Sequence, residues 1–202
     1  MSKFNENNGV LIQGHIKIHD PESGAVFVNK RNAIHYENMS IALAESVANQ
    51  GQGFINSMAF GNGGTSVDPT GIITYLTPNS TGTNASLYNQ TYSKVVDDRS
   101  VTNLDPQRNK IETRHVNGTN YTDVLVTCLL DYGEPNGQDA VDQASQANSL
   151  YVFDELGLVS FSPSGTGKLL THVVFHPVQK SLNRLVQIDY TVRVQSLSGF
   201  NE

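Results

Sequence analysis

The chain has 202 residues, of which 38% are hydrophobic and only 16% charged, and its formal net charge at pH 7 is −6. Its 13 lysines and arginines are scattered singly, apart from the neighbouring Lys30 and Arg31. We therefore expect no direct binding to nucleic acid, which requires clustered basic side chains. The single cysteine, Cys128, excludes an internal disulfide, and no apolar run reaches membrane-spanning length.

The composition favours a mainly β fold with long loops. Asn, Gln, Ser, Thr and 17 Gly take the share that charged and hydrophobic residues leave, and these residues build turns rather than helices. We expect a single β-rich domain over residues 10–195, a flexible N-terminal segment over 1–9 and a tail over 196–202. The polar start has no apolar signal region, so we expect synthesis in a reducing cytoplasm.

Apolar and polar side chains alternate over residues 10–19, which predicts a half-buried strand. The sequence Asp-Pro-Glu-Ser-Gly over 20–24 favours a turn, and residues 25–29 are predicted to return antiparallel to the first strand.

One helix is predicted, over residues 38–50. Asn38 or Ser40 can cap its start, and Gly51 lies where a C-terminal cap belongs. Apolar side chains recur every four residues, at Met39, Leu43 and Val47. The helix is also rich in alanine, so we expect it to pack closely on a sheet or on a neighbouring subunit.

Residues 54–60 predict a buried strand, which ends at a glycine-rich run. The stretch 61–93 that follows is Asn, Thr and Gly around short apolar pieces, of which 74–79 and 87–92 are expected to anchor the loop. A long irregular stretch of this kind in a compact chain is usually functional or part of an interface.

Residues 121–130 predict another strand, on which Cys128 is expected to be a small buried side chain. The segment 131–149 begins with glycine and proline breakers and has little apolar content, so it is predicted to be an exposed loop or arm. A short helix over 139–147 is the alternative.

The C-terminal third has the clearest strand pattern. Residues 151–161 and 168–176 predict neighbouring strands joined by a turn over 162–167, and five apolar residues alternate with polar ones over 186–194. Together the elements predict an antiparallel β-sandwich or barrel with one helix.

Motifs for catalysis fail on spacing. The run Gly165 to Lys168 resembles a phosphate-binding loop, but Ser162 stands where the motif needs glycine, and Leu169 where it needs Ser or Thr. The acidic pairs Asp97-Asp98 and Asp154-Glu155 are adjacent residues, whose side chains point to opposite faces of a strand.

The histidines are spaced too widely for a shared metal. His172 and His176 lie on a predicted strand, where four residues separate them by roughly 13 Å, whereas metal–ligand bonds are about 2 Å long. We therefore predict no enzyme activity, no cofactor and no metal site.

Three stretches carry a resemblance to a known group of proteins. They are residues 16–24 through 30–35, the run Met-Ala-Phe-Gly-Asn-Gly-Gly-Thr over 58–65, and Phe-Asp-Glu-Leu-Gly-Leu over 153–158. In this order they resemble uncharacterised virion structural proteins of contractile-tailed bacteriophages, which lie among the neck, tail and baseplate components. The similarity runs through most of 10–195 and is least in 131–149.

The resemblance implies a virion protein, synthesised in the cytoplasm of the bacterial host. We expect a neck or collar subunit at the head–tail junction, which forms a homo-oligomeric ring of sixfold-related symmetry with other neck or tail proteins as partners. Two alternatives remain. One is a host-recognition or carbohydrate-binding module of a fibre or baseplate, and the other is a capsid decoration protein.

The segments 61–93 and 131–149 are the predicted contacts with neighbouring subunits, through extended loops and strand addition. The alternative is that both are mobile surface loops. The candidate interface residues are Asn62, Thr65, Tyr75, Tyr88, Tyr92, Tyr132, Gln138 and Gln143.

Overall fold

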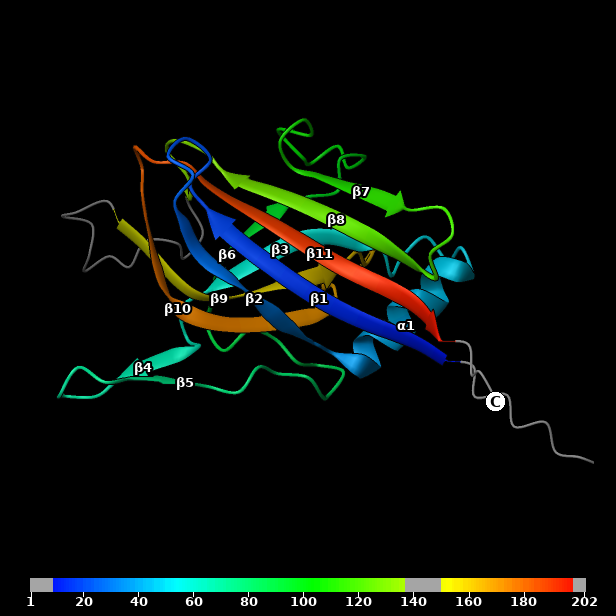
Figure 1. Ribbon diagram of the computed structural model, residues 1–202, viewed down its shortest axis with the longest axis horizontal. Helices are drawn as coiled ribbons and strands as arrows, with labels where there is room; N and C mark the ends of the chain where they lie inside the picture. Colours follow the sequence, from blue (N-terminus) through cyan, green and yellow to red (C-terminus); the bar gives the residue numbers. More distant parts are fainter. Residues whose placement is uncertain (1–8, 137–149, 198–202) are drawn as a thin grey trace, which may run out of the picture.

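The computed structural model describes residues 9–136 and 150–197 of the chain. Its main element is an antiparallel nine-stranded sheet with the order β6-β3-β9-β10-β2-β1-β11-β8-β7, which curls into a half-barrel (Figure 1). The strands of this sheet are β1 (Gly9–His19), β2 (Val26–Ile34), β3 (Ile55–Gly61), β6 (Gln90–Val95), β7 (Lys110–His115), β8 (Tyr121–Leu130), β9 (Leu150–Ser160), β10 (Thr171–Ser181) and β11 (Val186–Leu197). A separate two-stranded sheet pairs β4 (Thr65–Val67) with β5 (Ile73–Tyr75).

The prediction of a mainly β fold with one helix is confirmed. Of the two predicted architectures, sandwich and barrel, the structure is closer to the second, because one sheet curls through its own twist instead of splitting into two. Within the described residues, β6 and β7 remain the two edges of this sheet. Also among these residues, no helix has the length and apolar character needed to cross a membrane.

The hydrophobic core follows the predicted alternation. In β1 and β11, buried residues alternate with more exposed ones, and the register places Ile16 opposite Tyr190. At the other half of the sheet, Phe153 of β9 lies between three aromatic rings, whose centroids are 5.4, 5.5 and 5.7 Å from its own: Phe60, Tyr151 and Phe175.

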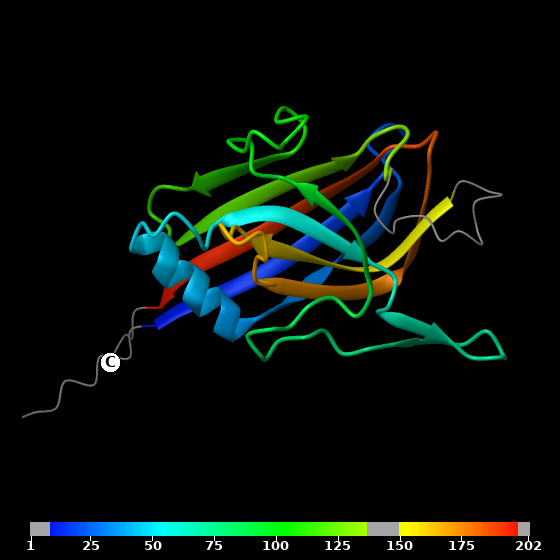
Figure 2. The ribbon, with the colours of Figure 1, turned by 180° about the vertical axis from the view of Figure 1, so that it is seen from behind.

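The helix α1 (Tyr36–Val47) begins two residues before its predicted start and ends three before its predicted end. Its cap is His35, whose ring accepts a hydrogen bond from the Asn38 backbone N–H. Asn38 lies inside the helix, fully buried, because its side chain donates to the Leu169 carbonyl. The helix covers one end of the concave face of the sheet (Figure 2) and buries Met39, while Val47 is exposed.

Strand β10 continues past its predicted end at His176. It runs through Pro177, because the pairing with β9 is shifted between Val174 and Val178, and an irregularity of this kind accommodates a proline. The turn before β10 contains Gly165 with φ of 83°. This turn joins β9 to β10, as predicted.

Candidate interaction site

The stretch 61–93 contains a β-hairpin that sequence patterns did not predict. Strands β4 and β5 form a projecting hairpin, here called the arm (residues 65–76), at one end of the molecule (Figure 1). Its turn is closed by the Asp68 carboxylate, which accepts hydrogen bonds from the Thr70 hydroxyl and from the Thr70 and Ile72 backbone N–H groups. These bonds lower the pKa of Asp68. The arm therefore has a defined shape.

Asp154 holds the first strand of the arm. This buried carboxylate of β9 accepts hydrogen bonds from the backbone N–H groups of Gly64 and Thr65, both at 2.9 Å, and from the Thr65 hydroxyl. A lone two-stranded hairpin is only marginally stable in water. The bonds to Asp154 therefore fix the base of the arm to the main sheet.

Glu155, next along β9, holds the segments that precede and follow the arm. Its carboxylate is fully buried and accepts hydrogen bonds from the backbone N–H groups of Gly63 at 3.1 Å, Tyr88 at 3.0 Å and Asn89 at 2.8 Å. The backbone passes so close that a Cβ at Gly61 would lie 2.5 Å from the Glu155 Oε1 atom. Only glycine fits there.

His172 of β10 completes this network. Its Nδ1 atom accepts a hydrogen bond from the Asn79 backbone N–H at 2.8 Å, and its Nε2 atom lies 2.9 Å from the Glu155 carboxylate. Because Nδ1 is an acceptor, the proton of the neutral ring lies on Nε2 and is donated to Glu155. Asp154, Glu155 and His172 are here called the anchor.

The anchor has the chemistry of a structural support. Its carboxylate oxygens are occupied by backbone and histidine donors, as buried charges require. Within residues 9–136 and 150–197, no group of three or more His, Cys, Asp or Glu is placed to hold a metal ion.

The anchor predicts a loss of stability in acid. Burial alone raises the pKa of Glu155, but hydrogen bonds from His172 and three backbone amides outweigh burial and hold this pKa below its ordinary value. Ionised Glu155 therefore stabilises the fold above about pH 4.5, and this contribution is lost as the pH falls through the lower folded-state pKa. We expect the Tm of the wild-type chain to fall more steeply below this pH than the Tm of Glu155→Gln.

Thermal unfolding from about pH 7 to about pH 3.5 checks this expectation. The control is Glu112→Gln, which removes an exposed carboxylate of β7 and should leave the shape of the wild-type profile unchanged. Parallel profiles for the wild-type chain and Glu155→Gln would show that Glu155 does not carry the acid response.

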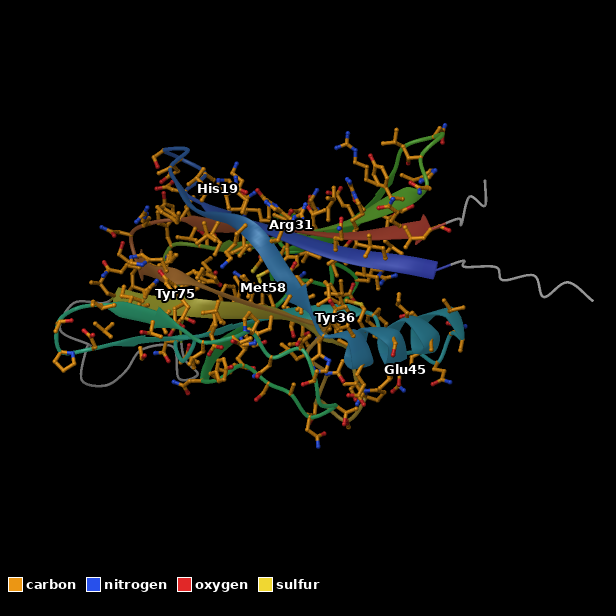
Figure 3. All side chains as sticks on the ribbon, turned by 60° about the horizontal axis from the view of Figure 1, so that its bottom comes forward. His19, Arg31, Tyr36, Glu45, Met58 and Tyr75 are labelled. Atoms are coloured by element: carbon orange, nitrogen blue, oxygen red, sulfur yellow. The ribbon has the colours of Figure 1, made fainter. Side chains whose placement is uncertain are left out.

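The predicted interface residues lie in different environments. Tyr75 on the arm (labelled in Figure 3), Tyr88, Asn62 and Tyr132 are exposed. Thr65 is half-buried at the anchor, and Gln138 and Gln143 lie outside the described residues. The prediction of Tyr92 as a surface contact is wrong for the folded chain. This side chain packs against Phe60, and burial raises its pKa to about 12.

The structure also places the cysteine and the two histidines that were considered for chemistry. The Cys128 thiol is fully buried, as predicted, and burial raises its pKa to about 12. His176 is exposed on β10, and its ring lies 3.4 Å from the Tyr75 hydroxyl, whereas His172 is buried.

The sequence motifs relate Asp154 and Glu155 to a catalytic pair and to a resemblance motif, and His172 to a metal pair, but not to one another. The signal that could have revealed their role is two adjacent carboxylates within the apolar run Val152 to Leu158, since buried charges need nearby donors.

No protein-family model, curated protein or solved structure matches this chain.

Proposed function

We propose that this chain is a structural subunit of a tailed-phage virion, at the neck or collar, which assembles into a ring through the arm. The observation that carries the proposal is the apolar surface of the arm. Val67 and Ile72 are 62% and 63% exposed, and Tyr75 and Leu76 of the same hairpin are exposed as well. Exposed apolar side chains on a projecting element are typical of a protein–protein contact.

The anchor makes the arm suitable for such a contact. Three buried side chains fix the base of the arm and its returning segment to the main sheet. A contact element that is already ordered loses less conformational entropy when it binds. The arm can therefore bind a neighbour through its apolar surface with little loss of conformational entropy.

A ring is the assembly that this geometry favours. The arm lies at one end of the half-barrel (Figure 1), so contact with a different surface of the next copy is heterologous, and heterologous contacts close into rings when the rotation divides a full turn. The strand edges β6 and β7 offer further sites for pairing with a partner. The resemblance of residues 16–24 through 30–35, 58–65 and 153–158 to phage virion proteins supports the same assignment.

The test is a pair of double variants of the full chain. Val67→Asp with Ile72→Asp places two charges on the arm, and we expect it to stay at the monomer mass of 22.0 kDa in mass photometry while the wild-type chain forms a ring. The control is Val101→Asp with Leu104→Asp, which charges two equally apolar and more exposed positions elsewhere. We expect the control to assemble as the wild-type chain does.

Circular dichroism should show the same fold in all three proteins, because the four positions are exposed. Assembly of the arm variant to the same mass as the wild-type chain would refute the role of the arm. A wild-type chain that is monomeric and does not co-purify with virions would refute the proposed function.

A carbohydrate-binding module of a fibre or baseplate is the second candidate. Tyr75 and Tyr88 are exposed, and aromatic rings of this kind stack on sugars. The Tyr88 hydroxyl also donates to the Thr77 carbonyl, which holds its ring in place. Binding on a glycan array that is lost in Tyr75→Ala or Tyr88→Ala would favour this candidate over a ring subunit.

A further inference from the structure

A polar concavity of about 600 Å³ lies on the outer face of the sheet, away from the arm and the anchor. It extends over β2, β1, β11, β8 and β7, and three arginines line it: Arg31, Arg114 and Arg193. His15, Gln13 and Asp123 are also part of the lining. Arg31 and Tyr75, both labelled in Figure 3, mark the concavity and the arm on separate parts of the molecule.

Strand register gathers these side chains from distant parts of the chain. His15 of β1 pairs with Arg31 of β2, and Gln13, two residues before it on the same face, pairs with Arg193 of β11. Arg193 in turn lies opposite Asp123 of β8. The pairing of β8 with β7 adds Arg114 opposite Asp123.

The central arginine is already satisfied. Arg193 makes two hydrogen bonds to the Asp123 carboxylate, at 2.7 and 2.9 Å, and its guanidinium lies 3.8 Å from the centroid of the Tyr121 ring. The bonds from Arg193 lower the pKa of Asp123, so this pair is charged on both sides and neutral in sum. It forms a fixed floor for the concavity.

The two outer arginines are available for a ligand. Neither the Arg31 nor the Arg114 guanidinium makes a hydrogen bond or an ion pair with any residue that the structure describes, and that of Arg114 interacts with Asp123 only through space. The three arginines and Asp123 give the concavity two positive charges in excess, although the whole chain carries −6. A positive site on an acidic protein is a local feature that needs its own explanation.

The spacing of Arg31 and Arg114 selects the ligand class. Four strand-to-strand steps separate β2 from β7, or about 19 Å along the sheet at about 4.8 Å a step. A single phosphate or carboxylate cannot contact both guanidinium groups over this span unless the two side chains extend toward each other across Arg193 and Asp123. A polypeptide can, when it carries two carboxylates roughly 10 Å or more apart, which is three or more residues of an extended chain.

Nucleic acid fits the same face less well. A nucleic-acid strand has a charge about every 3.4 Å and is bound by contiguous basic residues. Here Asp123 lies between the arginines. Glu112 and Asp189 lie on the same outer face beside Lys110 and Lys17, so charges of both signs are interspersed there. Two outer arginines on either side of the Arg193–Asp123 ion pair match sparse carboxylates.

We propose that this concavity binds an acidic segment of a partner protein, with carboxylates of the segment paired to Arg31 and Arg114. Gln13 and Thr191, between the two arginines, provide polar side chains to the backbone of the segment. Paired guanidinium–carboxylate hydrogen bonds are among the stronger polar contacts that proteins make. The site adds a second contact surface to the arm and does not depend on the proposed ring.

The experiment is a titration of the full chain with a fluorescent octaglutamate peptide at low ionic strength, followed by anisotropy. The test variant is Arg31→Gln with Arg114→Gln. The control is Arg99→Gln with Lys168→Gln, which also removes two positive charges, but from positions outside the concavity. We expect the test variant to bind the peptide at least about tenfold more weakly than the wild-type chain, and the control to stay within about threefold.

Three results would overturn the proposal. They are no binding of octaglutamate by the wild-type chain, an equal loss in both double variants, and displacement of the peptide by inorganic phosphate or a thymidine octanucleotide at equal or lower concentration. The arm variant Val67→Asp with Ile72→Asp should still bind the peptide as the wild-type chain does. Failure of the ring and failure of this site are therefore separate results.

Discussion

Replacement of Glu155 by glutamine is expected to lower the free energy of unfolding by about 3 kcal/mol. The carboxylate accepts four hydrogen bonds in a fully buried position, three of them from backbone N–H groups. A glutamine keeps one acceptor oxygen, but its NH₂ group turns two donors toward the donors of Tyr88 and His172. Each buried donor that loses its acceptor costs about 1–3 kcal/mol.

Urea unfolding measures this loss, and hydrogen exchange locates it. The amides of Gly63, Tyr88 and Asn89 should lose protection in Glu155→Gln before the amides of β1 and β11 do, since only the former bind the carboxylate. The control Glu112→Gln should change the free energy of unfolding by less than about 0.5 kcal/mol. An equally small change in Glu155→Gln would mean that the anchor does not hold the arm.

Replacement of Phe153 by alanine is expected to cost about 4 kcal/mol. The ring is fully buried and packs against three other aromatic rings, so its removal loses apolar burial and leaves a cavity among stiff neighbours. Phe153 also precedes Asp154 and Glu155 on β9, so a shift of this strand would move the anchor.

The matched control is Leu104→Ala, which removes an apolar side chain that is 97% exposed and should change stability by less than about 0.5 kcal/mol. Urea unfolding of the two variants beside the wild-type chain gives both values. A cost below about 1 kcal/mol for Phe153→Ala would show that the aromatic group does not form the core of this half of the sheet.

The strands with one buried face could be predicted from the sequence. In β1 and β11 the side-chain period of two is visible because one face packs on the core, and both strands have the predicted position. The edge strands could not be predicted in this way. Most residues of β7 are exposed, and its sequence Lys-Ile-Glu-Thr-Arg-His has no repeated apolar position. An edge strand needs only one hydrogen-bonded neighbour, so its sequence is weakly constrained.

The helix shows a different limit of sequence reasoning. Its existence was predicted from alanine content and apolar spacing, but its start depends on the ring of His35, a residue type that is not a usual cap. The burial of Asn38 inside the helix depends on the Leu169 carbonyl, 131 residues along the chain. A contact of that kind leaves no local pattern.

The anchor and the concavity depend on long-range register. Glu155 accepts hydrogen bonds from amides that lie 66 to 92 residues away in the sequence. Its position next to Asp154 therefore does not reveal these partners. Arg114 and Arg193 are single basic residues in the sequence and Arg31 is adjacent only to Lys30, which is why no basic cluster was expected. Antiparallel pairing of β2, β1, β11, β8 and β7 brings them to one face.

Electron cryo-microscopy of tailed-phage particles purified from cells that express this chain tests the proposed function most directly. We expect density for a ring of sixfold-related symmetry at the head–tail junction, in which Val67 and Ile72 of each arm are buried against the next copy. The anchor should hold the arm in the conformation described here. Absence of the chain from purified particles, or copies whose arms are free in solvent, would contradict a structural subunit that assembles through its arm.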